Sequence, residues 1–176
     1  MNDPSSPSIP MLASIQIAVT PNSSAYTFEL SIANQTPTPS PTSEPYFKLV
    51  TSEGFKHPSV RVRVPLNTPV QLNYSLKHRK FSNGTWTLQK IVVNDNPHLF
   101  LVSPYNDTGN SVTSQWTIND RTWTYTILGN SIAMLFANDA LNAVTSAYTV
   151  TIQPPNGAPL SFDPAVVNEP LPPAMP

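Results

Sequence analysis

Residues 15–32 read IQIAVTPNSSAYTFELSI, and this stretch decides the fold class. Apolar and polar residues alternate on both sides of a central TPNSS, residues 20–24. Alternation with a period of two is typical of a β-strand with one buried face. The TPNSS segment has the composition of a turn, because Pro, Asn and Ser favour turn conformations. The stretch therefore predicts a β-hairpin whose inward residues are Ile15, Ile17, Val19, Tyr26, Phe28, Leu30 and Ile32.

Similar short strands follow along the rest of the chain. They are separated by turn signals at intervals of roughly 8–12 residues, which is typical of all-β sandwiches. We expect strands in residues 46–50, 60–64, 70–76, 86–93, 99–102, 116–118, 123–127, 132–136, 148–152 and 160–162. Residues 116–127 form a second predicted hairpin about the turn at 119–121, and residues 139–144 are the only predicted helical turn. The pattern predicts an all-β, antiparallel two-sheet β-sandwich of immunoglobulin-like type.

Proline is unusually frequent, with 21 among 176 residues. Proline fixes φ and lacks a backbone N–H, so it is excluded from helix interiors and from central strands. Four prolines fall in residues 34–45, which we expect to be an extended surface crossing or a mobile loop. The predicted organisation is a single β-sandwich domain over residues 11–170, between a flexible tail at 1–10 and a proline-rich tail at 171–176.

The chain carries little charge. Charged residues make up 11% of it and the net charge is −1, whereas about 25% is ordinary. A net charge near zero gives little repulsion between copies, so one interpretation is a homo-oligomer; the alternative is a secreted or surface-type composition with no particular meaning. Nucleic acid is excluded as a partner because the basic footprint that phosphates require is missing. The absence of cysteine excludes a disulfide framework, a thiol nucleophile and a cysteine metal site.

No membrane partner is expected either. Residues 1–10 lack the basic and apolar regions of a signal peptide, and the longest apolar run, 132–137, is far too short to span a bilayer. We therefore expect a cytoplasmic protein, with secretion as the alternative if a signal has been removed from the mature chain.

The chemistry-bearing residues do not form a recognisable catalytic set. His57, His78 and His98 have no metal-ligand spacing and are interpreted as surface or turn residues. There is no GxSxG motif, and five glycines form no phosphate-binding loop. We expect no catalytic residue, no metal and no cofactor, and hence no enzyme. The Asn/Asp groups at 94–96, 106–107 and 138–139 are interpreted as turns, with calcium binding as the alternative.

Each tryptophan falls on the same predicted strand face as the aliphatic residues of its strand. Trp86, Trp116 and Trp123 are therefore expected in the core, with a carbohydrate-stacking platform as the alternative. Tyr148 stands where immunoglobulin-like domains place a corner tyrosine. The basic tip at residues 77–80 is interpreted as a solvated turn.

Residues 162–170 read FDPAVVNEP. The Asp163-Pro164 and Glu169-Pro170 dipeptides resemble the motif of the DP-EP family of uncharacterised bacterial proteins. That resemblance implies one immunoglobulin-like sandwich and no established activity. A residue before proline is pushed toward extended geometry, so we expect the two carboxylates to fasten the tail onto the sandwich edge by accepting hydrogen bonds from backbone N–H groups. A ligand site is the alternative. The prolines would blunt an edge strand against unwanted pairing.

These observations favour a non-enzymatic binding or interaction module that self-associates. The alternative is a lectin-like domain that binds carbohydrate or depends on calcium. The sequence does not identify a small-molecule ligand.

Overall fold

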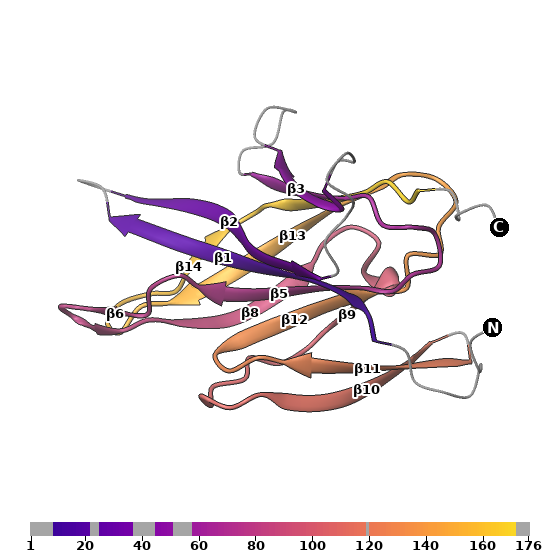
Figure 1. Cartoon of the computed structure of the whole chain (residues 1–176). Helices are drawn as coiled ribbons and strands as arrows, with labels where there is room; N and C mark the ends of the chain where they lie inside the picture. Colours follow the sequence, from indigo (N-terminus) through magenta and orange to yellow (C-terminus); the bar gives the residue numbers. More distant parts are fainter. Residues whose placement is uncertain (1–8, 22–24, 37–44, 51–57, 119, 172–176) are drawn as a thin grey trace.

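The computed structural model describes residues 9–21, 25–36, 45–50, 58–118 and 120–171, and strands dominate them (Figure 1). The all-β class is confirmed. The only helix in these ranges is the three-residue 3-10 helix η1 (Pro97–Leu99), so no helix here is long and apolar enough to cross a membrane. The helical turn expected at residues 139–144 is absent: residues 139–143 are bends and irregular backbone, and residue 144 begins a strand. Six residues are too few to repay helix nucleation without tertiary support.

The first large sheet has five strands in the order β2-β1-β5-β12-β9. Their bounds are β1 Met11–Pro21, β2 Tyr26–Thr36, β5 Val70–Leu76, β12 Ser131–Phe136 and β9 Phe100–Val102. β1 and β2 pair antiparallel, which confirms the first predicted hairpin. β1 and β5 run parallel, so the expectation of a purely antiparallel sheet is wrong. Alternation looks the same in parallel and antiparallel strands, and no hairpin dictates the direction between two strands so far apart in sequence.

The second large sheet is built around β13 (Val144–Gln153). β8 (Thr87–Val93) pairs with one side of β13. β14 (Leu160–Phe162) and β15 (Ala165–Asn168) pair with the other side in one continuous register, with Phe162 opposite Val150 and Ala165 opposite Ala147. They are therefore two halves of one interrupted strand. β4 (Ser59–Val62) pairs parallel with β15, and β3 (Phe47–Val50) lies beyond β4.

The two large sheets share one hydrophobic core, as the two layers in Figure 1 show. Rings contact across it: Phe28 of β2 stacks on Phe162 of β14, with centroids 4.5 Å apart. The molecule is therefore β-sandwich-like. Burial of alternate residues from both sheets is the physical reason that the sequence alternates.

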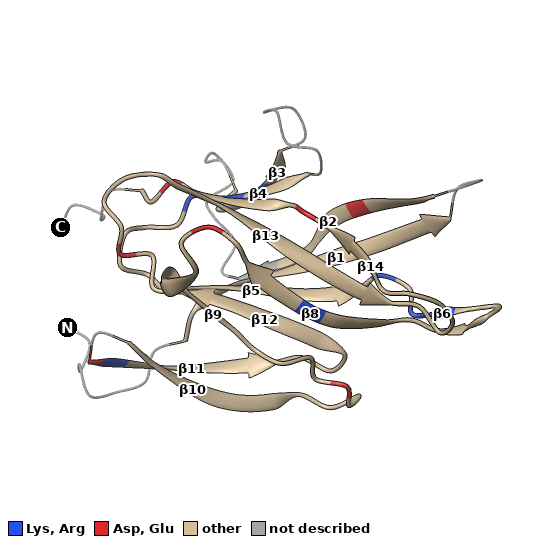
Figure 2. Ribbon diagram, turned by 180° about the vertical axis from the view of Figure 1, so that it is seen from behind, with Lys and Arg blue, Asp and Glu red and all other residues tan. Residues whose placement is uncertain are grey.

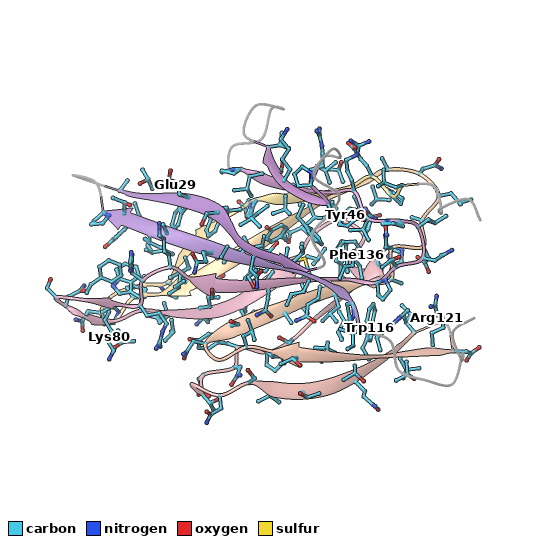
Figure 3. All side chains as sticks on the ribbon, in the orientation of Figure 1. Glu29, Tyr46, Lys80, Trp116, Arg121 and Phe136 are labelled. Atoms are coloured by element: carbon cyan, nitrogen blue, oxygen red, sulfur yellow. The ribbon has the colours of Figure 1, made fainter. Side chains whose placement is uncertain are left out.

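A third layer covers part of the outside. β10 (Val112–Ile118) and β11 (Arg121–Ile127) form the second predicted hairpin, whose Asn119 lies outside the described residues. Its aromatic face packs on Ala133, Leu135 and Ala137, the outward face of β12 and its end. Figure 3 shows Trp116 between this hairpin and the sheet. All six residues of β12 are consequently buried, as its unbroken apolar sequence predicted.

Candidate functional site

An aromatic pocket of about 260 Å³ lies at one end of the sheets. It forms where β1 ends and β2 begins, beside a short hairpin of β6 (Lys80–Phe81) and β7 (Gly84–Thr85). We call it the aromatic pocket and define it by the residues Pro21, Tyr26, Phe81, Ser82, Asn83 and Trp86. In Figure 3, Lys80 marks this end of the molecule.

Three aromatic rings shape the pocket. The Trp86 ring contacts Tyr26 at a centroid distance of 5.6 Å and Phe81 at 5.5 Å, both edge-on. Trp86 is 5% exposed and Tyr26 is 38% exposed, so Trp86 forms the floor and Tyr26 an accessible wall. The Trp86 indole N–H is buried and has no hydrogen-bond partner among the described residues. Edge-on contacts of this kind hold the rings in fixed relative positions.

The β6–β7 turn holds Phe81 against the floor. Gly84 has φ of 128°, and a Cβ there would come within 2.9 Å of Pro155. Only glycine fits this position without strain. The backbone N–H of Trp86 donates to the Arg79 carbonyl at 2.6 Å, which fixes the entry of the chain into the pocket floor.

The pocket lining is uncharged, although basic residues lie nearby. Lys77, His78 and Lys80 of the predicted basic tip are exposed, as expected of a solvated turn. Arg79 instead contacts Tyr105, where its charge and hydrogen bond only partly offset burial, so the pKa of Tyr105 is raised. The pocket therefore suits a neutral ligand with an apolar face.

The predicted tryptophan positions are confirmed by burial: Trp86, Trp116 and Trp123 are 5%, 8% and 1% exposed. Trp116 and Trp123 belong to the outer cluster under the β10–β11 hairpin. Only Trp86 also lines the aromatic pocket. If a carbohydrate stacks on a tryptophan of this chain, Trp86 in the aromatic pocket is therefore the candidate.

The Asn/Asp groups are used in turns. Asp95 accepts the Ala147 N–H at 3.1 Å. Asn106 donates to the Ile127 and Leu128 carbonyls, and Asn138 donates to the Val64 and Pro65 carbonyls. Asn96 and Asn138 have positive φ, a conformation that Asn tolerates in turns.

Asp107 and Asp139 flank opposite ends of β12, which are separated by about 20 Å at roughly 3.3 Å per residue. They cannot hold one ion together. The described residues contain no group of three His, Asp or Glu side chains that could bind a metal. A second hollow beside Asn138 and Asn168 measures only about 20 Å³, which is room for little more than one water.

The four motif residues lie in or just beyond the interrupted β14–β15 strand, whose β14 half is an edge of the second sheet. Asp163 and Pro164 interrupt the strand between β14 and β15, and β15 lies between β13 and β4. Asp163 accepts the Thr149 hydroxyl at 2.7 Å, and Glu169 pairs with Arg61 and Arg63 at 3.5 and 3.8 Å. Both carboxylates therefore contact side chains, and the expected hydrogen bonds from backbone N–H groups stay a prediction.

Pro164 explains the interruption. Its carbonyl still accepts the Tyr148 N–H at 3.0 Å, but proline has no N–H to return the second ladder bond. Glu169 and Pro170 follow β15, and the chain continues to Leu171, which exchanges hydrogen bonds with Val64 and Leu66.

The remaining single-residue predictions have mixed outcomes. Tyr148 is not a corner tyrosine, because its hydroxyl meets the Tyr74 hydroxyl at 2.7 Å inside the core. His78 and His98 are exposed turn residues, as predicted. His57, most of the segment 34–45 and nearly all of both tails lie outside the described residues.

No protein-family model matches this sequence, and no curated protein matches it. A solved structure that it is similar to is the inclusion body protein PixA from Burkholderia cenocepacia J2315. The two share 9% identity with a TM-score of 0.40, over 97% of this chain and 100% of that one. A likeness this weak carries no conclusion about the chain. The resemblance to the DP-EP family stays a prediction that rests on its two dipeptides.

Sequence reasoning missed the aromatic pocket, although it singled out Trp86. Tyr26 and Phe81 each adjoin a turn signal, TPNSS and Asn83-Gly84 respectively. Aromatic residues beside two turns would have marked one end of the sheets. Nothing in the sequence says that these two turns lie at the same end, which depends on β1 and β5 being parallel.

Proposed function

We propose that the chain is a non-enzymatic binding module whose ligand site is the aromatic pocket, and that it self-associates. The observation that carries this proposal is a neutral pocket with Trp86 as its floor and the accessible Tyr26 ring as one wall. Aromatic residues in desolvated pockets supply most of the binding energy at protein interfaces, where charged residues are depleted. The low charge of the whole chain supports self-association, because copies repel one another little.

The fold proposal is an immunoglobulin-like sandwich. It is supported by the shared core of the two large sheets. The parallel pairs β1–β5 and β4–β15 make both sheets mixed, so any immunoglobulin-like arrangement here includes parallel strands.

Size-exclusion chromatography with light scattering over a concentration series tests self-association. We expect a mass above that of one 19.2 kDa chain that rises with concentration. Tyr26→Ala removes an accessible wall of the pocket and should shift the mass toward the monomer. Leu141→Ala is the matched control, because Leu141 is also apolar and 83% exposed but does not line the pocket. A strict monomer at every concentration would contradict self-association.

A lectin-like domain is the second candidate. The exposed Tyr26 ring beside the hydroxyl of Ser82 and the amide of Asn83 supports it, since sugars present both apolar faces and hydroxyls. Thermal unfolding with simple sugars, with calcium and with EDTA tests this candidate. A ligand at about 100 times its Kd stabilises by roughly 2.7 kcal/mol, which raises the Tm of a chain this size by about 5–10 °C.

A further inference from the structure

We propose that the aromatic pocket binds the proline-rich segment 172–176 of a second copy of this chain, in the polyproline II conformation. This inference rests on the proposed function and names the partner of the same site. It makes the association head-to-tail.

The segment has the right periodicity. Residues 172–176 read PPAMP, with prolines at 172, 173 and 176. Polyproline II has three residues per turn, so Pro173 and Pro176 share one face of the helix. The segment contains no charged residue, and it matches the uncharged lining of the pocket.

The pocket has the chemistry that recognises this conformation. Proline-rich segments dock on aromatic-lined surfaces, and the stiffness of polyproline II reduces the entropy lost on binding. The aromatic pocket offers such rings: Tyr26 and Phe81 form its walls, and Trp86 forms its floor. Ser82 and Asn83 add polar side chains to the lining, and such groups can bond to the solvated carbonyls of a polyproline II segment.

The geometry requires a second copy. Leu171 bonds to Val64 and Leu66, before β5 begins, whereas Phe81 of the pocket comes after β5 ends. The seven residues of β5 span about 23 Å at roughly 3.3 Å each. Five residues beyond Leu171 reach only about 16 Å in polyproline II. Figure 1 shows the start of β5 and the β6 hairpin on opposite sides of the molecule.

Two surfaces at opposite ends make a heterologous contact, which propagates into rings or filaments. Each copy donates one segment and accepts another. An association of this kind can be complemented: a copy with a defective pocket still donates its segment, and a copy with a defective segment still has a pocket.

Complementation is therefore the experiment. Tyr26→Ala impairs the pocket, and Pro173→Ser combined with Pro176→Ser impairs the segment. Each variant alone should be monomeric by light scattering, and an equal mixture should form a complex of two chains. Circular dichroism melting must show each variant folded. If each folded variant associates like the wild type, or if the mixture stays monomeric, the inference is wrong.

A peptide of residues 169–176 gives an independent measurement on the full chain. It should lower the mass of the wild-type assembly and change the tryptophan emission. The Pro173→Ser and Pro176→Ser peptide should bind at least about tenfold more weakly. A peptide of residues 1–10 has prolines at 4, 7 and 10 among serines; equal binding by it would overturn the assignment to the C-terminal segment.

The outcomes separate the two proposals. If the chain self-associates but neither the peptide nor the segment variants change the mass of the assembly, this inference is wrong and the proposed function still stands. A monomer that binds no peptide would refute both. A monomer whose pocket binds a simple sugar would refute the inference in favour of the lectin-like candidate.

Discussion

Tyr74 and Tyr148 form a buried polar contact in the core. Their hydroxyls are 2.7 Å apart, and their rings meet edge-on with centroids 5.6 Å apart. Tyr74 lies on β5 and Tyr148 on β13, so the contact joins the two large sheets. Burial raises the pKa of both phenols above the ordinary value. Each hydroxyl is satisfied by the other, which fixes how the two sheets align.

Removing one of the two hydroxyls should lower the free energy of unfolding more than removing both. Tyr148→Phe leaves the Tyr74 hydroxyl buried without this partner, and such a loss costs about 1–3 kcal/mol. The double variant Tyr74→Phe, Tyr148→Phe leaves neither group unpaired and should be closer to the wild type in free energy of unfolding. Urea denaturation of Tyr74→Phe, Tyr148→Phe and the double variant measures the free energy of unfolding of each. A double variant whose loss equals the sum of the two single losses would contradict the pairing.

The same two phenols predict an alkaline limit to stability. The folded pKa of each lies above the unfolded value of about 10, so the folded state keeps its protons where the unfolded state loses them. The contribution of the two phenols to the free energy of unfolding is fully present below about pH 10. Above that pH it falls, by up to about 1.4 kcal/mol per pH unit for each phenol. Unfolding between pH 9 and 12 should show this slope. The slope should be smaller in the double phenylalanine variant.

At the scale of elements, the β10–β11 hairpin is a cover for β12. Without it, Ala133, Leu135 and Ala137 would face water on the outside of the first sheet. Trp123 is the most buried of its aromatic residues, and Arg121 lies over its ring at 5.4 Å. Gln71 of β5 also donates to the Thr126 carbonyl at 2.8 Å, which ties the hairpin to the sheet.

Trp123→Ala should loosen the hairpin while the sandwich core stays folded. The lost burial costs about 3–5 kcal/mol, and hydrogen exchange should speed up in β10, β11 and β12 before β13. Thr124→Ala, on the other face of the same strand, is the control and should change stability by less than about 0.5 kcal/mol. Uniform acceleration over all strands would show that the hairpin is not a separate unit.

The interrupted β14–β15 strand depends on its two carboxylates. Asp163→Asn with Glu169→Gln weakens the contact to Thr149 and removes the ion pairs with Arg61 and Arg63. The ion pairs are partly exposed and are worth at most about 1 kcal/mol. We expect the Tm to fall by about 2–6 °C, since each kcal/mol shifts a chain of this size by about 2–4 °C. An unchanged melting curve would show that the carboxylates do not fasten the strand.

Strands were predictable from the sequence because side-chain alternation is a local property. Both hairpins followed from alternation on either side of a turn, and the burial of β12 followed from its unbroken apolar run. Strand direction was not predictable, because the partner of β1 lies more than fifty residues away. The corner role given to Tyr148 failed for the same reason: its partner, Tyr74, belongs to the opposite sheet.

The candidate site was harder to predict than the fold. Trp86 has the alternation of a core residue and is buried like one, so nothing local distinguishes it from Trp123. Its pocket exists because the ends of β1 and β5 coincide and bring Tyr26 beside Phe81. The motif dipeptides were visible in the sequence, but their place inside the sheet depends on pairing with β13 and β4.

At the scale of the whole molecule, charge is sparse and scattered, as Figure 2 shows. One consequence is that the long edge strand β2 has little charge to oppose pairing with another strand: Glu29 is its only charged residue. The Ile17 carbonyl bonds to Lys77, on the side of β5. Backbone groups alternate sides along a strand, so Gln16 and Ala18 bond toward β2, to Ser31 and Glu29. The backbone groups of Phe28 and Leu30 therefore point outward, where another strand could add.

Glu29 should prevent this edge from pairing with another strand, since charged residues on edge strands oppose pairing between sheets. Figure 3 shows its side chain on the outer strand. Glu29→Thr should leave the Tm nearly unchanged and raise the mass or turbidity at high concentration. Glu29→Lys keeps a charge and should behave like the wild type. Because edge pairing does not involve the aromatic pocket, the extra association should resist the 169–176 peptide. Extra association that the peptide reverses would place it at the pocket instead.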